Sequence, residues 1–277
     1  MSAVTGFEQQ MVDTLLALLP GSRRDRAGNA VLTLGSGGVR RLAVCPLDEP
    51  GFVVGHIRDD GYLTLRRSPG APRDNDRQLE GQRVSIATAG GVVPGVVAVR
   101  SIHLTRGRDR IVGGFTVDSA VVDVGAASKA EVEALGIRTL APVTLPQRPH
   151  RYGGDRLAAP LAGRRAACAA LVVAARQAAA RQGMIPRRQS VVIAFVVEYQ
   201  LSARGLGTLA HSAGPFQETL VIGDDSAATV GQQLPALGAV RAKSLPVRYA
   251  GTQVESVVLS DVGRLADELV TWIGATR

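Results

Sequence analysis

The residues of this chain that could do chemistry are few and widely spaced. An acidic pair, Asp48-Glu49, follows an apolar run and precedes Pro50-Gly51. Carboxylates at such a position could bind a metal ion or act as a general base. Taken alone, however, the pair is better explained as the polar end of a strand followed by a turn.

The histidines do not form a recognisable metal site. They are His56, His103, His150 and His211. None of them shows H-x-x-x-H spacing or clustering, so each is expected to be a surface or structural residue rather than a ligand.

The two cysteines, Cys45 and Cys168, are too few for a disulfide framework and lack the spacing of a metal site. Cys168 lies in an Ala-rich run and is expected to be a small buried hydrophobe. A nucleophilic Cys45 would need a neighbouring base such as histidine, and the sequence suggests none. A reducing cytoplasm is therefore the expected compartment.

Composition argues against a nucleic-acid-binding protein. The formal net charge is +8, but the basic residues are almost all arginines spread along the chain, and the densest groups, Arg23-Arg24 and Arg187-Arg188, are short. Aromatic residues make up only 4% of the 277 residues, which is too few for a base-stacking platform. A solvated basic surface is the expected role of the arginines.

Neither a membrane span nor a secretory signal is expected. No apolar run reaches the roughly 18 residues that a span would need. The first 13 residues include polar Glu8, Gln9 and Gln10 and have no basic segment before an apolar one.

Hydrophobic periodicity predicts an α/β domain interrupted by a β-rich insertion. Helices are expected at 7–19, 164–182 and the C-terminus, and strands at 30–34, 41–45, 51–57, 190–197 and 218–224. The run 190–197 is continuously apolar, which is typical of a strand covered on both faces. Residues 63–154 instead alternate short β-rich runs with Gly- and Pro-rich turns around one capped helix at 128–136. We therefore expect an α/β domain of residues 1–62 and 155–277 and an inserted barrel or sandwich of residues 63–154.

Several segments carry a resemblance through their order and spacing. They are Asp25 to Asn29 (D-x-x-G-N), Leu47 to Phe52, Gly95-Val96, Ile102 to Leu104, Val122 to Ala126, Leu245 to Tyr249, and Glu255 with Ser260 to Val262. Together they resemble the zinc-dependent tetrahedral aminopeptidases, a family of glutamyl and deblocking aminopeptidases and relatives named endoglucanases. The resemblance implies a phosphorylase/hydrolase-like α/β fold, a mixed sheet flanked by helices, with an inserted small β-barrel dimerisation domain.

The resemblance also identifies where the metal ligands of the family would fall, and most of those positions lack donors. The first histidine ligand corresponds to Pro46, and the bridging aspartate of an L-D-[DN]-R motif corresponds to Ala162. The closing histidine of an R-Y-x-H motif corresponds to Gly251. None of these three side chains can coordinate a metal ion.

A further motif of the family, Q-E-E-x-G-x-R-G, aligns with Arg204-Gly205. This alignment replaces the catalytic glutamate by Tyr199 and a ligand glutamate by Gln200, with Glu198 beside them. Only Asp224, after the strand at 218–224, is a possible surviving ligand. Asp48 survives as a remnant whose family role is to orient the lost histidine.

The last loop of the site keeps its framework, since Arg248, Tyr249 and Glu255 match the family and are expected to fix that loop by hydrogen bonds. The stretch from Asp224 to Leu245 has about twenty residues and is shorter than in the family. The missing residues belong to the part that lies on the substrate side in the family.

These observations lead to a first hypothesis: a catalytically inactive homologue of a dinuclear zinc aminopeptidase, retained for assembly or for binding a peptide or partner. No cofactor is expected. Homo-oligomers through the inserted domain, or assembly with an active paralogue, are the expected partnerships. The alternative is an active hydrolase with a rearranged or single-metal site, using zinc or cobalt with Asp48, Glu198 and Asp224. Nucleic-acid binding ranks third.

Overall fold

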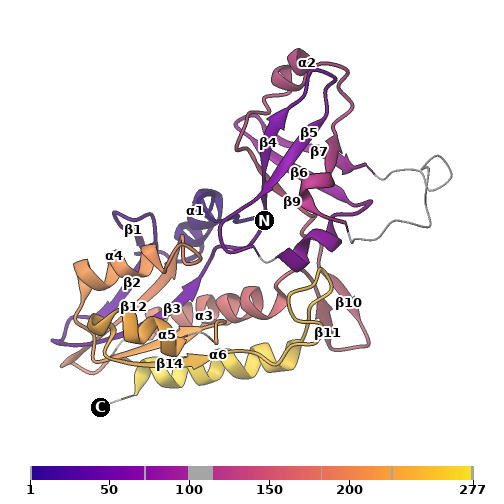
Figure 1. Ribbon diagram of the computed structural model, residues 1–277. Coiled ribbons are helices and arrows are strands. Elements are labelled where there is room, and N and C mark those ends of the chain that lie inside the picture. Colours follow the sequence, from indigo (N-terminus) through magenta and orange to yellow (C-terminus); the bar gives the residue numbers. More distant parts are fainter. Residues whose placement is uncertain (1, 72, 99–114, 182, 226, 276–277) are drawn as a thin grey trace. The chain divides into compact units, whose positions relative to one another are not determined.

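The computed structural model describes residues 2–71, 73–98, 115–181, 183–225 and 227–275 (Figure 1). The chain divides into two compact units. Unit 1 comprises Ala3–Asp48 and Arg148–Arg277, and unit 2 comprises Ser2 and Glu49–Gln147. His103 and the matched segment around it lie outside the described residues. No helix among the described residues is long and apolar enough to cross a membrane.

Unit 1 is built on a six-stranded mixed sheet with the order β1-β2-β12-β3-β13-β14. Its strands are β1 (Arg23–Arg24), β2 (Ala30–Gly35), β3 (Val39–Pro46), β12 (Gln189–Val196), β13 (Glu218–Ile222) and β14 (Ala239–Lys243). From β12 through β3 and β13 to β14 neighbouring strands are parallel, whereas β2 is antiparallel to both β1 and β12. The carboxyl ends of β12, β3 and β13 therefore meet at one edge of the sheet.

Hydrophobic residues of β12 alternate between two cores, as expected for a strand covered on both faces. Val191, Ile193 and Phe195 belong to one core, which is completed by α1 (Gln9–Leu18), α3 (Ala162–Ala180) and α6 (Leu259–Gly274). The interleaved Val192, Ala194 and Val196 belong to the other, which is completed by α4 (Arg204–Ala213) and α5 (Ala227–Gln233). The predicted strand at 190–197 and helix at 164–182 are confirmed by β12 and α3.

A second sheet of unit 1 is small and antiparallel. It has the order β10-β11-β15, formed by His150–Tyr152, Arg156–Ala158 and Ser256–Val258. Strand β15 leads directly into α6, so the predicted C-terminal helix is present. Among the described residues between β13 and β14, the regular elements are α5 and one 3-10 turn, η5 (Pro235–Leu237).

Unit 2 is a closed barrel with the strand order β4-β5-β8-β7-β6-β9. The strands are β4 (Phe52–Ile57), β5 (Leu63–Arg67), β6 (Arg83–Thr88), β7 (Gly91–Val97), β8 (Val121–Asp123) and β9 (Pro142–Thr144), with 3-10 turns η1 (Arg73–Gln78) and η4 (Val117–Ser119). Helix α2 (Lys129–Ala134) begins at the predicted cap, where Ser128 Oγ accepts from the Glu131 amide. The mixed α/β fold with an inserted barrel is as predicted.

The unit boundaries differ from the sequence prediction of 1–62, 63–154 and 155–277. Strand β4 pairs with β5 and β9, so it is a barrel strand rather than part of the outer sheet. Strand β10, expected in the insertion, pairs with β11 of unit 1. Short strands have similar apolar patterns wherever they lie, and only pairing assigns them to a sheet.

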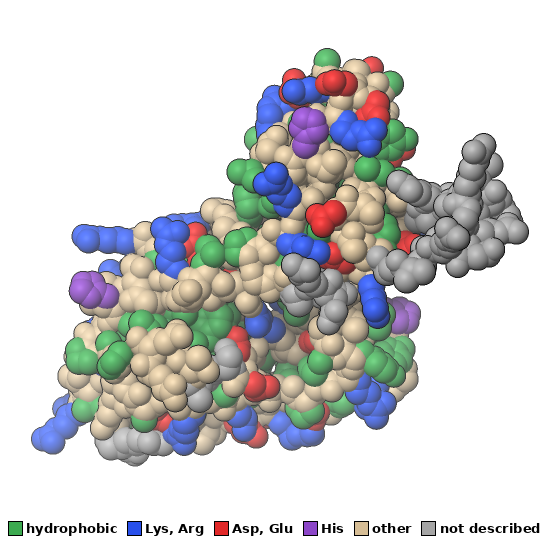
Figure 2. Space-filling view, viewed as in Figure 1, with side chains coloured by type: hydrophobic (Ala, Val, Ile, Leu, Met, Phe, Trp, Pro, Cys, Tyr) green, Lys and Arg blue, Asp and Glu red, His purple; other side chains and the backbone are tan. Residues whose placement is uncertain are grey.

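Basic side chains are dispersed on the face of the molecule shown in Figure 2, where they alternate with acidic and uncharged side chains. Arg24, Arg58 and Arg264 each pair with an aspartate of their own unit. These arginines therefore belong to a solvated surface on which some of the basic side chains form ion pairs.

Candidate functional site: the carboxyl ends of the central strands

The candidate site lies where β3, β12 and β13 end. Ligands of open α/β sheets bind outside the carboxyl ends of the strands, because side chains of neighbouring loops converge there. Pro46 is the last residue of β3 and Asp48 follows it, Tyr199 and Gln200 follow β12, and Asp224 follows β13. The topology therefore brings together five residues that the sequence singled out from three separate segments.

The D-x-x-G-N segment fixes the end of β12. Asp25 accepts hydrogen bonds from the Asn29 amide and from its side chain, at 2.9 and 2.7 Å. The buried Asn29 side chain in turn donates to the Gly205 carbonyl and accepts from the Val197 amide, both at 2.9 Å. The motif is thus structural: it holds the loop between β12 and α4.

Asp48 is fully buried and holds the same loop from the other side. Its Oδ2 atom accepts from the Gln200 amide at 2.8 Å and from the Thr5 hydroxyl at 3.1 Å. Its Oδ1 atom is buried without a hydrogen-bond partner among the described residues. Burial raises the pKa of Asp48, although these hydrogen bonds and the charge of Arg164 oppose the rise.

Glu8 is a second buried carboxylate beside this loop, and the sequence analysis gave it no role. Its Oε1 atom accepts from the amides of Gly6 and Glu198, each at 3.0 Å. Burial raises its pKa, and the nearby negative charge of Asp48 adds to the rise. Both carboxylates therefore act as acceptors for backbone amides, not as bases facing an open site.

The positions of the catalytic and ligand glutamates lie in a tight loop. Glu198, Ser202 and Ala203 have φ values of 51 to 54°, a left-handed conformation unusual for residues with side chains. Tyr199 is buried in the hydrophobic core on the α4 side of the sheet. Glu198 instead pairs with Arg204 at 2.9 Å. The loop therefore presents no free carboxylate at the position of the base.

The start of α3, where the resemblance places the bridging aspartate, is packed with apolar side chains. Ala162 is buried in the core shared by α3 and β3. At Gly163, an added Cβ would lie 2.5 Å from Val247 Cγ1 and 3.2 Å from Glu255 Oε1. Because real Cβ atoms do not approach so closely, Val247 occupies the space that a side chain at 163 would need.

Glu255 fixes the last loop, as predicted, but it does so through backbone amides. Its Oε1 accepts from the Gly163 amide and its Oε2 from the Gly251 amide, both at 2.8 Å. A carboxylate at the N-terminus of α3 is favoured by the exposed amides and the helix dipole. Gly251 has a φ of 72° and open space around its Cα.

Arg248 and Tyr249 contribute differently from the prediction. Arg248 pairs with Ser256 through its backbone, with both N–H···O distances at 3.0 Å, and its side chain is exposed. The Tyr249 carbonyl accepts from the Thr252 hydroxyl at 2.7 Å, while the ring is 60% exposed. The backbone of this segment, not its guanidinium, shapes the loop.

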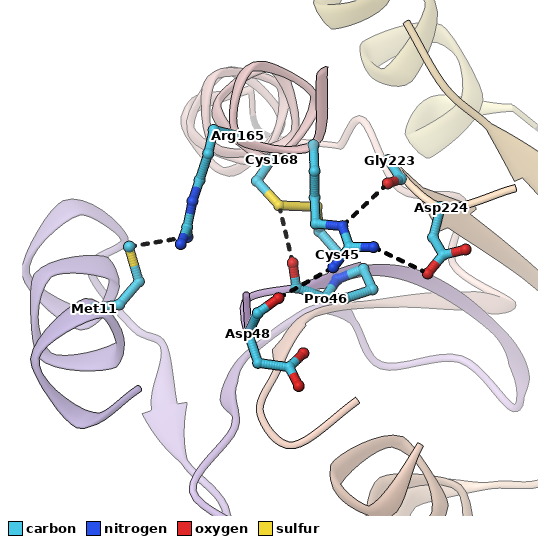
Figure 3. The surroundings of a disulfide bond; sticks show 9 residues. Met11, Cys45, Pro46, Asp48, Arg165, Cys168, Gly223 and Asp224 are labelled. Carbon is cyan, nitrogen blue, oxygen red and sulfur yellow. Dashed lines mark hydrogen bonds and ion pairs between the residues drawn. A yellow bond between two sulfur atoms is a disulfide. The ribbon is translucent and has the colours of Figure 1, made fainter. Parts of the chain in front are cut away.

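Asp224, the one possible surviving ligand, lies beside a cation of the chain itself. Arg164 Nη2 is 3.4 Å from Asp224 Oδ2, and both side chains are largely buried. The same guanidinium donates to the Asp48 carbonyl at 3.0 Å and to the Gly223 carbonyl at 3.4 Å. Figure 3 shows Asp48, Gly223 and Asp224 together at this edge of the sheet.

The prediction for the cysteines was wrong. Cys45 of β3 and Cys168 of α3 form a disulfide with a Cα–Cα distance of 5.7 Å (Figure 3). Cys168 Sγ also lies 3.6 Å from the carbonyl oxygen of Pro46, a packing contact because a disulfide sulfur has no proton to donate. The two cysteines are 123 positions apart, so nothing local in the sequence indicates the pairing.

The donor set present here does not fit a dinuclear metal centre. Such a centre needs a bridging carboxylate and further histidine or carboxylate ligands on each ion, whereas the positions that the resemblance assigns to them hold Pro46, Ala162, Tyr199, Gln200 and Gly251. Within the described residues, no three His, Cys, Asp or Glu side chains are grouped so that they could hold a metal ion.

Comparison with known proteins agrees with the architecture. The family model described as M42 glutamyl aminopeptidase matches residues 28–223. Lysyl aminopeptidase of Pyrococcus furiosus is 27% identical over 210 residues, which are 76% of this chain and 58% of that protein. SgcX of Escherichia coli is 29% identical over 178 residues, which are 62% of this chain and 47% of that protein. The chain thus spans about half the length of these curated relatives.

Two solved structures share the fold. The TET1 peptidase of Pyrococcus horikoshii superposes with a TM-score of 0.82 at 20% identity, covering 99% of this chain and 96% of that one. An aminopeptidase of Desulfurococcus kamchatkensis superposes with a TM-score of 0.80 at 19% identity, covering 100% and 92%. At such identities the likeness establishes the fold alone.

Proposed function

Because this chain belongs to the M42 glutamyl aminopeptidase family, we propose that it is a member without metal-dependent catalysis, retained for assembly or for binding a peptide or partner. The observation that carries the proposal is the loss of donor atoms at Pro46, Ala162 and Gly251. No rotation of these side chains can create a ligand. The packing of Val247 against Gly163 supports it further, since Val247 occupies the space that a side chain at this position of the L-D-[DN]-R motif would need.

The remaining acidic groups each have a structural partner. Asp48 holds the Gln200 amide, Glu198 pairs with Arg204, and Asp224 faces Arg164. An active single-metal hydrolase, the alternative reading, would have to release these three carboxylates and direct them to one ion. The arrangement favours the inactive homologue because each of these contacts would be lost.

Assembly is the role that the proposal gives to unit 2. The solved relative from Pyrococcus horikoshii is described as assembling into a tetrahedron or a large octahedral shell. We propose that this chain likewise forms homo-oligomers through its barrel, whose strand β7 exposes Val92 and Val96. Assembly with an active paralogue would use the same surface. Placement in the cytoplasm remains a prediction from the sequence.

Metal content measured on the purified full chain tests the central proposal. Elemental analysis is expected to find far less than one zinc or cobalt ion per chain, and no release of chromogenic product from aminoacyl substrates. Lysyl aminopeptidase from Pyrococcus furiosus, purified in the same buffers, serves as the positive control. About two ions per chain, as in a dinuclear hydrolase, or product release abolished by a chelator, would refute it.

Light scattering of the same preparation tests the assembly. Charges introduced by Val92→Glu and Val96→Glu together are expected to lower the oligomer mass, because burying them at an interface is costly. The control is Val173→Glu, at an exposed apolar position on α3 of unit 1. Equal loss of mass in both variants, or a monomeric parent, would contradict a barrel interface.

A further inference from the structure

The disulfide connects two elements on which the family resemblance places metal ligands. Cys45 directly precedes Pro46, the position of the first histidine ligand, at the end of β3. Cys168 lies on α3, the helix that begins at Ala162, the position of the bridging aspartate. A metal ion held at both positions would have joined the end of β3 to α3, and the disulfide joins the same strand to the same helix.

A retained residue, the arginine of the L-D-[DN]-R motif, supplies positive charge at this edge. The carboxyl ends of parallel strands present carbonyl oxygens, and Asp224 adds a carboxylate to them. Arg164 offers a fixed cation with several donors, and it contacts the Asp48 carbonyl, the Gly223 carbonyl and the Asp224 carboxylate at 3.0 to 3.4 Å. The guanidinium thereby satisfies acceptors from the ends of both β3 and β13.

We propose that the Cys45–Cys168 disulfide has replaced the metal centre as the crosslink of this edge of the sheet, while the retained Arg164 guanidinium supplies its counter-charge. This inference rests on the proposed absence of a metal centre. The crosslink serves as a permanent lock. Cys45 is fully buried and Cys168 nearly so, and buried sulfurs are shielded from thiols in solution.

The position of the disulfide in the chain increases its expected contribution to stability. The cysteines are separated by 123 positions, and the interval between them includes the whole of the inserted segment Glu49–Gln147. Closing so long a loop removes much of the conformational freedom of the unfolded chain. The crosslink therefore closes a loop that contains the whole of Glu49–Gln147.

Formation of the bond balances with an ordinary disulfide oxidant. One cysteine thiolate attacks oxidised glutathione and releases one glutathione thiolate, giving a mixed disulfide. The second cysteine thiolate displaces the other glutathione, so two protein thiols become one disulfide while two reduced glutathione molecules form. Reduction by dithiothreitol reverses the exchange.

The test compares the oxidised and reduced forms of the same full chain by thermal unfolding. Oxidation is done with oxidised glutathione, and the redox state is checked by alkylation in denaturant followed by intact mass. The oxidised form is expected to melt about 10 to 15 °C higher than the reduced form. In the folded protein, reduction by dithiothreitol is expected to be much slower than in urea.

Two further arms separate this inference from the proposed function. Zinc added to the reduced protein is expected to leave its melting temperature unchanged, because two thiols do not complete a tetrahedral site. In the oxidised protein, Arg164→Met is expected to lower the melting temperature by about 4 °C, the loss of buried charge-assisted hydrogen bonds. The matched control Arg176→Met changes an exposed arginine on the same helix and is expected to shift it by under about 1 °C.

Equal melting temperatures for the oxidised and reduced forms, or recovery of stability when the reduced protein takes up zinc, would overturn the inference. So would equal effects of Arg164→Met and Arg176→Met. Metal found in the purified oxidised protein would instead refute the proposed function, so the two failures can be told apart.

Discussion

At the start of β3, the buried side chain of Arg41 meets partners on several sides, whereas just beyond the end of the same strand the buried Asp48 carries an oxygen without one. The Arg41 guanidinium donates to the carbonyls of Trp272 and Ala275 at 2.7 and 3.1 Å, and lies 4.0 Å from the centre of the Trp272 ring. Glu218 adds a carboxylate at 3.6 Å.

The two ends of β3 differ in kind. The Arg41 end is a structural site with its partners in place, whereas the Asp48 end is the remnant of a different site. Arg41 caps the C-terminus of α6, where cations are favoured. Asp48 is placed where the family orients a ligand histidine, but position 46 is proline and offers no N–H to the Oδ1 atom. Burying a polar group costs desolvation free energy, and this cost remains when the hydrogen-bond partner of the group is lost. The carboxyl end is held by the disulfide, the proposed replacement, and by the retained Arg164.

The largest effect on stability is expected when the Arg41 site is disrupted. Arg41→Met should lower the free energy of unfolding by about 3 to 5 kcal/mol, because it removes the buried partner of Glu218 and uncaps α6. Urea unfolding followed by circular dichroism measures the change. Arg241 binds the same glutamate from a half-exposed position, so Arg241→Met should cost under about 1 kcal/mol. Similar losses in both variants would remove the distinction.

An intermediate effect is expected at the other end, where Val247 packs against Gly163. Gly163→Ala should lower stability by about 1 kcal/mol, because overlap with Val247 exceeds the gain in helix propensity. In a Val247→Ala background the same substitution should become neutral or stabilising. A double-mutant cycle in urea measures the coupling. Additive effects would show that Val247 does not occupy this space.

The smallest effect concerns Asp48. Its raised pKa means that the folded protein binds this proton more tightly than the unfolded chain does. Its contribution therefore favours folding below the ordinary pKa of an aspartate and is lost as the pH rises through the raised value.

Asp48→Asn should remove that part of the pH dependence while changing stability at neutral pH by less than about 1 kcal/mol, since the amide oxygen can still accept from Gln200 and Thr5. Unfolding free energies measured from pH 4 to pH 8 for the variant and the parent test this. Parallel curves would mean that Asp48 does not titrate differently on folding.

The sequence by itself determined the secondary-structure elements. It also determined which side chains lack metal-binding donor atoms. Apolar periodicity located α1, α3, β12 and β13, because the spacing of buried side chains follows the local backbone. The identity of residues such as Pro46 and Ala162 settled that no donor atom stands there, whatever the geometry.

Only the tertiary structure decided which distant groups meet. The Cys45–Cys168 pairing, the contacts of Arg164 and the packing of Val247 against Gly163 join segments far apart in the chain, where no local pattern links them. The same holds for β4, which strand pairing assigns to the barrel. A disulfide is not typical of the reducing cytoplasm predicted from the sequence, and it was the fold that brought the two sulfurs within reach.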